Sequence, residues 1–273
     1  MTRGRALRLL AAGLVLANGL FPALWILLTS FKSDAELTRL PITWLPAAPT
    51  LANYRHALTD QPLPLYLFNS VAVALLSTAL ALLVSVLAAY ALARLPVPRP
   101  GLVLAALVAT GTFPLVTLLT PLFETMRSLG LLNSYAALVL PYSVLSLPVC
   151  TLVLVSFFET LPAELEAAAL VDGCTPMQAL RYVVVPLAAP GVFTAGILAF
   201  VNAWDEFLLA LSFNAAPRMR TLPVGIALFQ GEFSFPWPVI SAALVIAIVP
   251  VAAVIVVFQE RVVSGLTAGG VKG

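Results

Sequence analysis

Charge is scarce in this chain of 273 residues. Only 10% of the residues are Asp, Glu, Lys or Arg, whereas 61% are hydrophobic, and the mean hydropathy is +1.04. A soluble domain usually carries about 25% charged residues. The composition therefore excludes an ordinary soluble domain. The net charge of +2 gives no reason to expect a nucleic-acid partner.

Residues that commonly hold metals or carry catalysis are also rare. The chain has one histidine, His56, and two cysteines, Cys150 and Cys174, without metal-ligand spacing. There is no Gly-x4-Gly-Lys-Ser/Thr loop for nucleotide phosphates. We therefore expect no catalytic residue, no metal and no cofactor on this chain, and a membrane-embedded enzyme is disfavoured. No internal repeat is visible, which disfavours a secondary carrier working alone.

The few charges are segregated. Six runs contain no Asp, Glu, Lys or Arg, and each is long enough to cross a hydrocarbon core, which takes about 20 helical residues. These runs cover residues 9–31, 61–93, 100–123, 128–158, 182–204 and 233–259. We predict an all-α polytopic membrane protein with six transmembrane helices, at about residues 7–28, 66–93, 101–122, 135–158, 191–211 and 237–258. The first run is too long for a signal peptide, so we expect a retained span.

The stretch 159–190 differs from the rest because it carries helix punctuation and four acids in its first half. Pro162 marks a helix start, and Gly173 stands where a helix takes its left-handed C-terminal residue. Thr175 and Pro176 mark a second start, and Pro186 is expected to stop that helix. The pattern predicts a short helix, a glycine turn and a second short helix.

Three consecutive alanines lie on the first of these helices, at positions 167, 168 and 169. Alanine has no side-chain entropy to lose, and it allows another backbone to approach closely. We therefore interpret this helix as a docking element.

The stretch resembles the EAA loop of the permeases of binding-protein-dependent ABC importers. The residues that carry the resemblance are Glu164-Leu-Glu-Ala-Ala-Ala-Leu-Val-Asp-Gly173, followed by Val-Val-Val-Pro186-Leu187 and Pro190. Further segments in the same order resemble the carbohydrate branch, and in particular its maltose-type second permease subunit. They are residues 43–46, 53–54, 89–94, 130–135, 204–207, 220–225 and 265–273.

The resemblance implies a type I ABC permease fold and a set of partners. Residues 1–65 would hold the first span and an extracytoplasmic segment, residues 66–258 the permease core with its coupling loop, and residues 259–273 a cytoplasmic tail. The implied partners are a second permease, two ATP-binding cassette subunits, an extracytoplasmic solute-binding protein, a sugar and membrane lipid. ATP would be used by the partner ATPase.

The resemblance also assigns a coupling site that contacts the ATPase. Its residues are Glu164, Glu166, Ala167, Ala168, Ala169, Asp172, Gly173 and Pro186. This sequence departs from the family pattern at one position, because the glutamate of the Glu-Ala-Ala motif falls on Ala167. Glu166 lies one residue earlier, about 100° away around the helix. Whether Glu166 replaces the missing acid is left open.

A second candidate site lies at the end of the fifth predicted span. Asp205 and Glu206 interrupt an apolar stretch that continues to Leu211, and an acid within a membrane span is a candidate functional group. With Asn202 and Trp204 these residues offer hydrogen bonds and a stacking face for a sugar. A charge network between spans is the alternative.

The distribution of basic residues predicts the orientation. With the N-terminus inside, eight basic residues face the cytoplasm and six face outward, and three arginines precede the first span. We expect a multi-pass protein of a bacterial or archaeal inner membrane with both termini cytoplasmic. The predicted function is the permease subunit of an ATP-driven sugar importer. The alternatives are a permease for glycerol-3-phosphate or another non-sugar solute and, less favoured, a stand-alone carrier.

Overall fold

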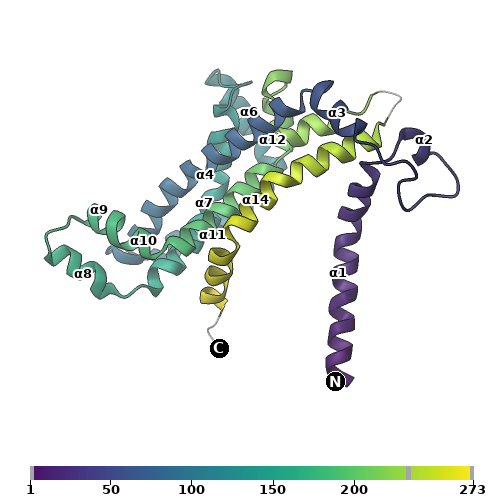
Figure 1. The fold of residues 1–273 in the computed structure, drawn as a ribbon. Helices are drawn as coiled ribbons and strands as arrows, with labels where there is room; N and C mark the ends of the chain where they lie inside the picture. Colours follow the sequence, from purple (N-terminus) through teal and green to yellow (C-terminus); the bar gives the residue numbers. More distant parts are fainter. Residues whose placement is uncertain (1–2, 232–234, 271–273) are drawn as a thin grey trace. The chain divides into compact units, whose positions relative to one another are not determined.

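The computed structural model describes residues 3–231 and 235–270, with side chains from residue 8 to residue 257 outside the gap (Figure 1). All regular elements in these ranges are helices. The chain divides into two units. One comprises Met1–Leu67 and Val224–Val249, and the other comprises Phe68–Pro223 and Pro250–Gly273.

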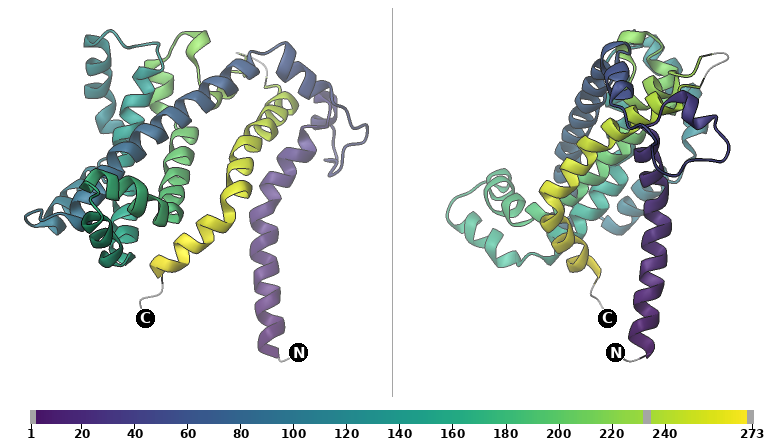
Figure 2. Two further views of the ribbon diagram at one scale, coloured as in Figure 1. Left: turned by 60° about the vertical axis from the view of Figure 1, so that its left-hand side comes forward. Right: turned by 45° about the vertical axis from the view of Figure 1, so that its right-hand side comes forward.

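The first unit holds a long helix and a compact polar segment. α1 runs over Arg3–Thr29, and the segment that follows carries α2 (Asp34–Leu37) and α3 (Ala52–Thr59). The unit also contains the first part of α14 (Trp237–Gly270). Figure 2 shows α1 and the two short helices from two further sides.

Polar contacts fold the segment after α1. The amide of Asn53 donates to the carbonyls of Ser30 and Lys32, at 2.8 Å each. Lys32 is only 1% exposed; its ammonium donates to the carbonyl of Thr43 and lies 4.7 Å from the ring centroid of Trp25. Glu36 accepts from the Thr43 hydroxyl at 2.7 Å and from the Ala47 amide at 2.9 Å. These bonds satisfy the polar groups that the segment buries.

The second unit is a helical bundle that begins in α4 (Leu63–Arg94) and includes α5 (Pro100–Thr110), α6 (Leu115–Ser128) and α7 (Ala136–Thr160). It continues through α8 (Ala163–Val171), α9 (Pro176–Ala179), a π-helical turn (Leu180–Val184) and α10 (Val185–Leu187). It then forms α11 (Ala189–Asp205), α12 (Leu208–Phe213) and a 3₁₀ turn (Pro217–Met219). The short α13 (Leu222–Ala227) crosses the boundary between the units.

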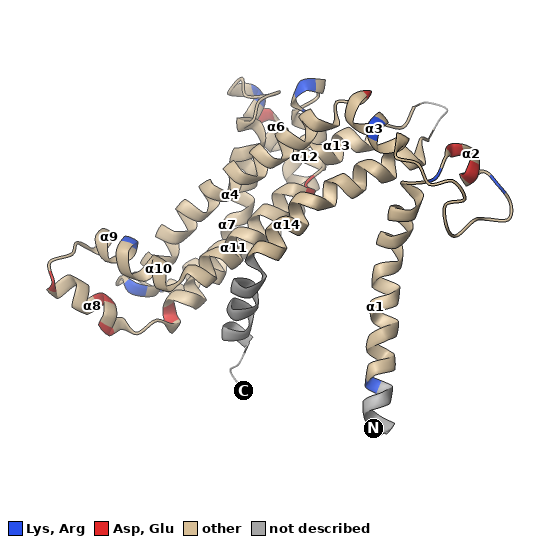
Figure 3. Cartoon of the chain, viewed as in Figure 1, with Lys and Arg blue, Asp and Glu red and all other residues tan. Residues whose placement is uncertain are grey.

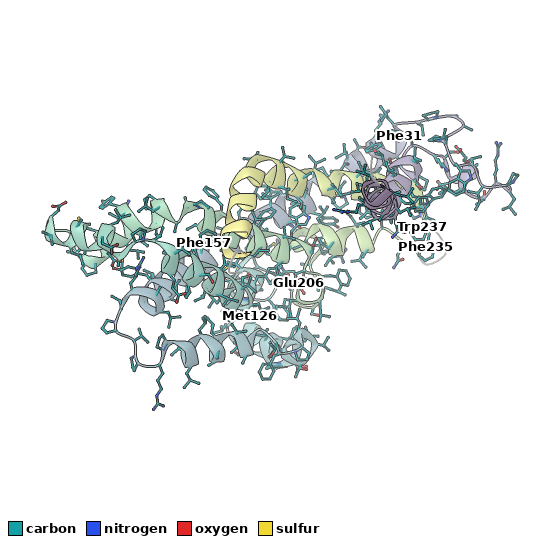
Figure 4. All side chains as sticks on the ribbon, turned by 90° about the horizontal axis from the view of Figure 1, so that it is seen from below. Phe31, Met126, Phe157, Glu206, Phe235 and Trp237 are labelled. Carbon is teal, nitrogen blue, oxygen red and sulfur yellow. The ribbon has the colours of Figure 1, made fainter. Side chains whose placement is uncertain are left out.

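The core of this bundle lies between α4, α7, the π-helical turn and α11. Its centre contains Leu154, Phe158, Leu180 and Ala195. α7 and α11 pack so closely that a Cβ at Gly191 would lie 2.3 Å from Cγ of Phe157. A view along another axis shows Phe157 and Glu206 in this bundle (Figure 4). The π-helical turn after α8 and α9 is therefore packed into the core of the bundle.

Within the described residues, four helices are long and apolar enough to cross a membrane, namely Arg8–Thr29, Leu63–Arg94, Ala136–Thr160 and Trp237–Val257. Two bent pairs meet the same test, so there are six spans if each pair forms one. One pair is Pro100–Thr110 with Leu115–Ser128, bent by 87°, and the other is Pro176–Leu187 with Ala189–Asp205, bent by 81°. The all-helical, multi-span architecture is thus confirmed.

Two details of the predicted helices are wrong. The third predicted span is not one straight helix, because the chain breaks between α5 and α6 at a stretch that contains Gly111 and Pro114. The fifth does not reach Leu211, because α11 ends at Asp205 and a separate helix follows. The helix that begins at Pro176 ends at Leu187, one residue after the predicted stop at Pro186. The chain stays helical through Leu187, and the π-helical turn precedes a proline that has no N–H to donate.

The C-terminal part of the chain is described only as backbone. α14 extends to Gly270, past the predicted end of the last span at about residue 258. Residues 271–273 lie outside the described residues, as do the side chains of residues 258–270. The division at residues 65 and 258 and the role of the tail stay predictions.

Candidate coupling loop and candidate substrate pocket

The turn between α8 and α9 has the geometry that its residues predict. Gly173 has a φ of +94°, which L residues rarely adopt. Its amide donates to the Leu170 carbonyl at 3.1 Å, and the Cys174 amide donates to the Ala169 carbonyl at 2.9 Å. This pair of bonds is the Schellman motif, which closes a helix C-terminus.

The next helix begins with a capping box. The hydroxyl of Thr175 accepts from the Gln178 amide at 3.3 Å, and the Gln178 side chain accepts from the Thr175 amide at 2.8 Å. The loop is therefore held by local bonds at both helix ends.

α8 presents a mostly apolar surface to the outside. Ala167 and Ala168 are exposed, as are Leu165 and Val171, the last at 87%. Figure 3 shows acidic residues on α8, in the turn that follows it and at the end of the helix that precedes it. An exposed apolar surface outside a membrane span is typical of an interaction site.

The predicted coupling residues divide into two groups. Glu164, Asp172, Gly173 and Pro186 are exposed with Ala167 and Ala168, so all six are accessible to another chain. Ala169 is buried, and the side chain of Glu166 is only 13% exposed. Glu166 instead contacts Tyr90 and Arg94 of α4. Neither of these two residues is among the predicted coupling residues.

The second candidate site contains a pocket of about 200 Å³ within the second unit. Asn202 and Glu206 line it from the end of α11, and Thr110 and Gly111 line it from the end of α5. Tyr142 lines it from α7. The break between α5 and α6 therefore opens space beside the predicted polar residues.

Of the four predicted pathway residues, the structure brings two to this pocket. Trp204 is buried and stacks on Phe200, with ring centroids 5.8 Å apart. Asp205 is exposed and does not line the pocket. Asn202 is exposed, so its amide is available to a solute.

Glu206 has a structural role in addition to its place at the pocket. Its carboxylate accepts from the Leu209 amide at 2.8 Å and from the Ala210 amide at 3.1 Å, which caps α12. It also accepts a short hydrogen bond from the hydroxyl of Tyr142. The bond to Tyr142 connects the residue after α11 to α7 and involves only one charged group, whereas the predicted alternative was a charge network between spans. No cluster of three or more metal-binding side chains occurs among the described residues.

The chain is similar to a known protein family and to individual transport proteins. The family described as "Binding-protein-dependent transport system inner membrane component" matches residues 81–267. The sulfoquinovosyl glycerol transport system permease protein SmoH of Agrobacterium fabrum is 72% identical over 270 residues, with 99% of this chain and 95% of that protein covered. The trehalose/maltose transport system permease protein MalG of Thermococcus litoralis is 38% identical over 272 residues, covering 98% and 97%.

A solved structure supports the fold independently. A chain from the crystal structure of a bacterial ABC transporter that imports the acidic polysaccharide alginate has a TM-score of 0.79 and 24% identity, covering 95% of this chain and 98% of that chain. The chain therefore belongs to the binding-protein-dependent transport system inner membrane components, and it is a multi-pass ABC permease subunit rather than an enzyme.

Proposed function

We propose that this chain forms half of the translocation pathway of an ATP-driven sugar importer, with a second permease as the other half. The family supports an ATPase and a binding protein as partners. Two ATPase subunits would use the ATP, and this chain would bind no nucleotide. The observation that carries the proposal is the exposed apolar surface of α8, held by a Schellman turn at one end of the bundle.

The proposed substrate is sulfoquinovosyl glycerol or a related sugar glycoside. The 72% identity with the sulfoquinovosyl glycerol permease supports this assignment, and the trehalose/maltose relative supports the sugar class. Asn202 and Glu206 are proposed to lie on the pathway, with Trp204 and Asp205 beside them at the end of α11.

The substrate is tested with the assembled complex in proteoliposomes, together with its cognate binding protein. We expect ATP-dependent uptake of sulfoquinovosyl glycerol in preference to maltose, trehalose and glycerol-3-phosphate. Preferential uptake of glycerol-3-phosphate would exclude the sugar assignment. Uptake that survives removal of ATP would point to a carrier that works alone.

The proposed orientation places α8 and both termini in the cytoplasm. α4 is continuous from Asn69 to Arg94, a distance of about 38 Å at 1.5 Å per residue. In the proposed orientation these residues would therefore lie on opposite sides of the membrane. Arg94 bonds the loop beside α8, whereas Asn69 bonds the carbonyls of Arg218 and Arg220. Arg94 and the three N-terminal arginines belong to the predicted inner side.

Docking to the ATPase is tested by cross-linking from Ala168. A photoreactive residue at this exposed position is expected to capture the ATPase subunit in native membranes. The same residue at Val144, an exposed position in the middle of α7, is the control and is expected to capture none. Cross-links from Ala168 to lipid alone would remove the docking role.

A further inference from the structure

Glu166 differs from the other acid of α8 because it points into the protein. The hydroxyl of Tyr90 donates to its carboxylate at 2.5 Å, and Nε of Arg94 lies 3.6 Å from the second carboxylate oxygen. The Arg94 and Glu166 side chains are 12% and 13% exposed. Glu164, two residues earlier, is exposed and makes no such contact in the described part of the chain.

The partners of Glu166 lie on the last turn of a membrane span. Tyr90 and Arg94 are four residues apart at the end of α4, so their side chains share one face of the helix. Glu166 bridges them. Within the residues whose side chains are described, every hydrogen bond or ion pair between an α8 side chain and a spanning helix involves Glu166.

Arg94 extends this contact to a third helix. Its guanidinium donates to the carbonyls of Phe158 and Leu161, at 2.7 Å each, where α7 ends. The ends of α4 and α7 and the start of α8 therefore meet at one guanidinium. Nε of Arg94 is buried and has no hydrogen-bond partner in the described structure. The negative charge nearest to it is the carboxylate of Glu166. Removal of one member of a buried ion pair leaves the other charge uncompensated.

We propose that Glu166 is a positioning residue that links α8 to α4, and that it is not a contact to the ATPase. This inference rests on the proposed function, in which the ATPase docks on α8; we take the ATP-driven movement of the ATPase to displace this helix. The neutral surface around Ala167 and Ala168 would take the docking contact, and Glu166 would pass the displacement to the end of α4. The family acid missing at Ala167 is then not replaced by Glu166, since Glu166 is already engaged within its own chain.

The test uses the assembled complex in proteoliposomes and measures substrate transported per ATP hydrolysed. We expect Glu166→Ala complexes to retain the ATPase subunit in the wild-type ratio and to keep hydrolysing ATP. Transport per ATP should fall by about tenfold or more, the size expected from losing charge-assisted hydrogen bonds. Glu159→Ala, which removes an exposed acid from the end of α7, is the control and should change this ratio by less than about twofold.

The other outcomes overturn the proposal. Loss of the ATPase subunit from Glu166→Ala complexes would make Glu166 a docking contact, while leaving the proposed function intact. Unchanged transport per ATP would show that the contact between Glu166 and α4 does not transmit the movement of α8. If the Glu166→Ala protein does not insert into the membrane, Tyr90→Phe tests the proposal instead. This milder change removes only the hydroxyl that donates to Glu166. It should lower transport per ATP by several-fold, and an unchanged ratio would overturn the link.

A distance measurement tests the link without relying on transport. Spin labels at Val171, beside the docking surface, and at Leu95, directly after α4, are both placed at exposed positions, with Cys174→Ser as background. The link predicts one narrow distance that is the same in nucleotide-free and vanadate-trapped complexes. In Glu166→Gln complexes, where the charge that faces Arg94 is lost, the distribution should broaden in the trapped state. A wild-type distance that changes between the two states would overturn the link.

Discussion

Gly173 shows how one residue sets the shape of the coupling loop. An L residue at a positive φ is strained, and no atom lies within 4 Å of the Cβ that a substitution would add. A change at this position therefore acts through the backbone conformation and not through a steric clash.

We predict that Gly173→Ala destabilises the turn by about 1–2 kcal/mol, because alanine lacks the conformational freedom of glycine. The complex should assemble less efficiently, as measured by copurification of the ATPase subunit, and its transport should fall. Gly173→Asn is the control and should lose less, because asparagine tolerates left-handed conformations better than alanine does. Equal losses in the two variants would contradict this explanation.

Glu36 makes the stability of the polar segment after α1 dependent on pH. The amide of Ala47 and the hydroxyl of Thr43 hold the pKa of this carboxyl below its ordinary value of 4.5. Because the folded pKa is lowered, the stabilisation is complete above the unfolded pKa and is lost as the pH falls through the folded pKa.

We expect the protection of the backbone amides of residues 33–47 from hydrogen exchange, measured relative to the intrinsic rate at each pH, to fall below about pH 4, where protonation begins to remove this stabilisation. Glu36→Gln should show faster exchange at neutral pH and a weaker dependence on acid. Asp34→Asn, which changes an exposed carboxylate of α2, should behave as the wild-type chain does. A wild-type response in Glu36→Gln would exclude Glu36 as the cause.

Among whole elements, α7 and α11 are held together by a close approach of ring and backbone. Gly191 is required there, because Phe157 occupies the space that any side chain would need. Interiors are packed too densely to absorb an added methyl group without a shift.

We predict that Gly191→Ala lowers the stability of the purified protein by about 1–3 kcal/mol, which is typical of overpacking. Thermal unfolding in detergent measures the change. In a double variant with Phe157→Ala the two losses should be less than additive, because this change removes Cγ and Cδ2, the two atoms nearest to the new Cβ. Gly101→Ala is the control, since no atom lies within 4 Å of its added Cβ. A loss at Gly101 equal to that at Gly191 would contradict the steric explanation.

The whole molecule must be oriented in its membrane for the coupling loop to meet an ATPase. Cys174 lies in this loop and is partly exposed, whereas Cys150 is fully buried. Cys174 is therefore accessible to a thiol reagent, whereas Cys150 is shielded from it by the protein.

We expect a membrane-impermeant maleimide to label Cys174 in inside-out vesicles and not in intact cells. In a Cys174→Ser background, Ala215→Cys should show the reverse, because Ala215 is exposed in the loop at the other end of the bundle. Labelling of both positions from the same side would contradict the predicted topology.

Local signals account for what the sequence predicted well. The helix–turn–helix of the coupling loop could be predicted from the sequence, because Gly173, Thr175 and Pro176 set the backbone conformation within a few residues of themselves. Long uncharged runs predict spanning helices for an equally local reason, since each backbone group in lipid must be satisfied within its own segment.

The amino-acid sequence by itself determined the all-helical membrane class, the family and the coupling loop, because hydropathy, helix caps and motif residues act over short stretches. Only the tertiary structure decided that Glu166 points toward α4, that the third predicted span is divided into two helices bent by 87°, and that Asn202 and Glu206 share a pocket with Tyr142. Tyr90 and Glu166 are 76 residues apart, and Tyr142 and Glu206 are 64 apart. Contacts across such separations depend on how the helices pack, and no local pattern in the chain records them.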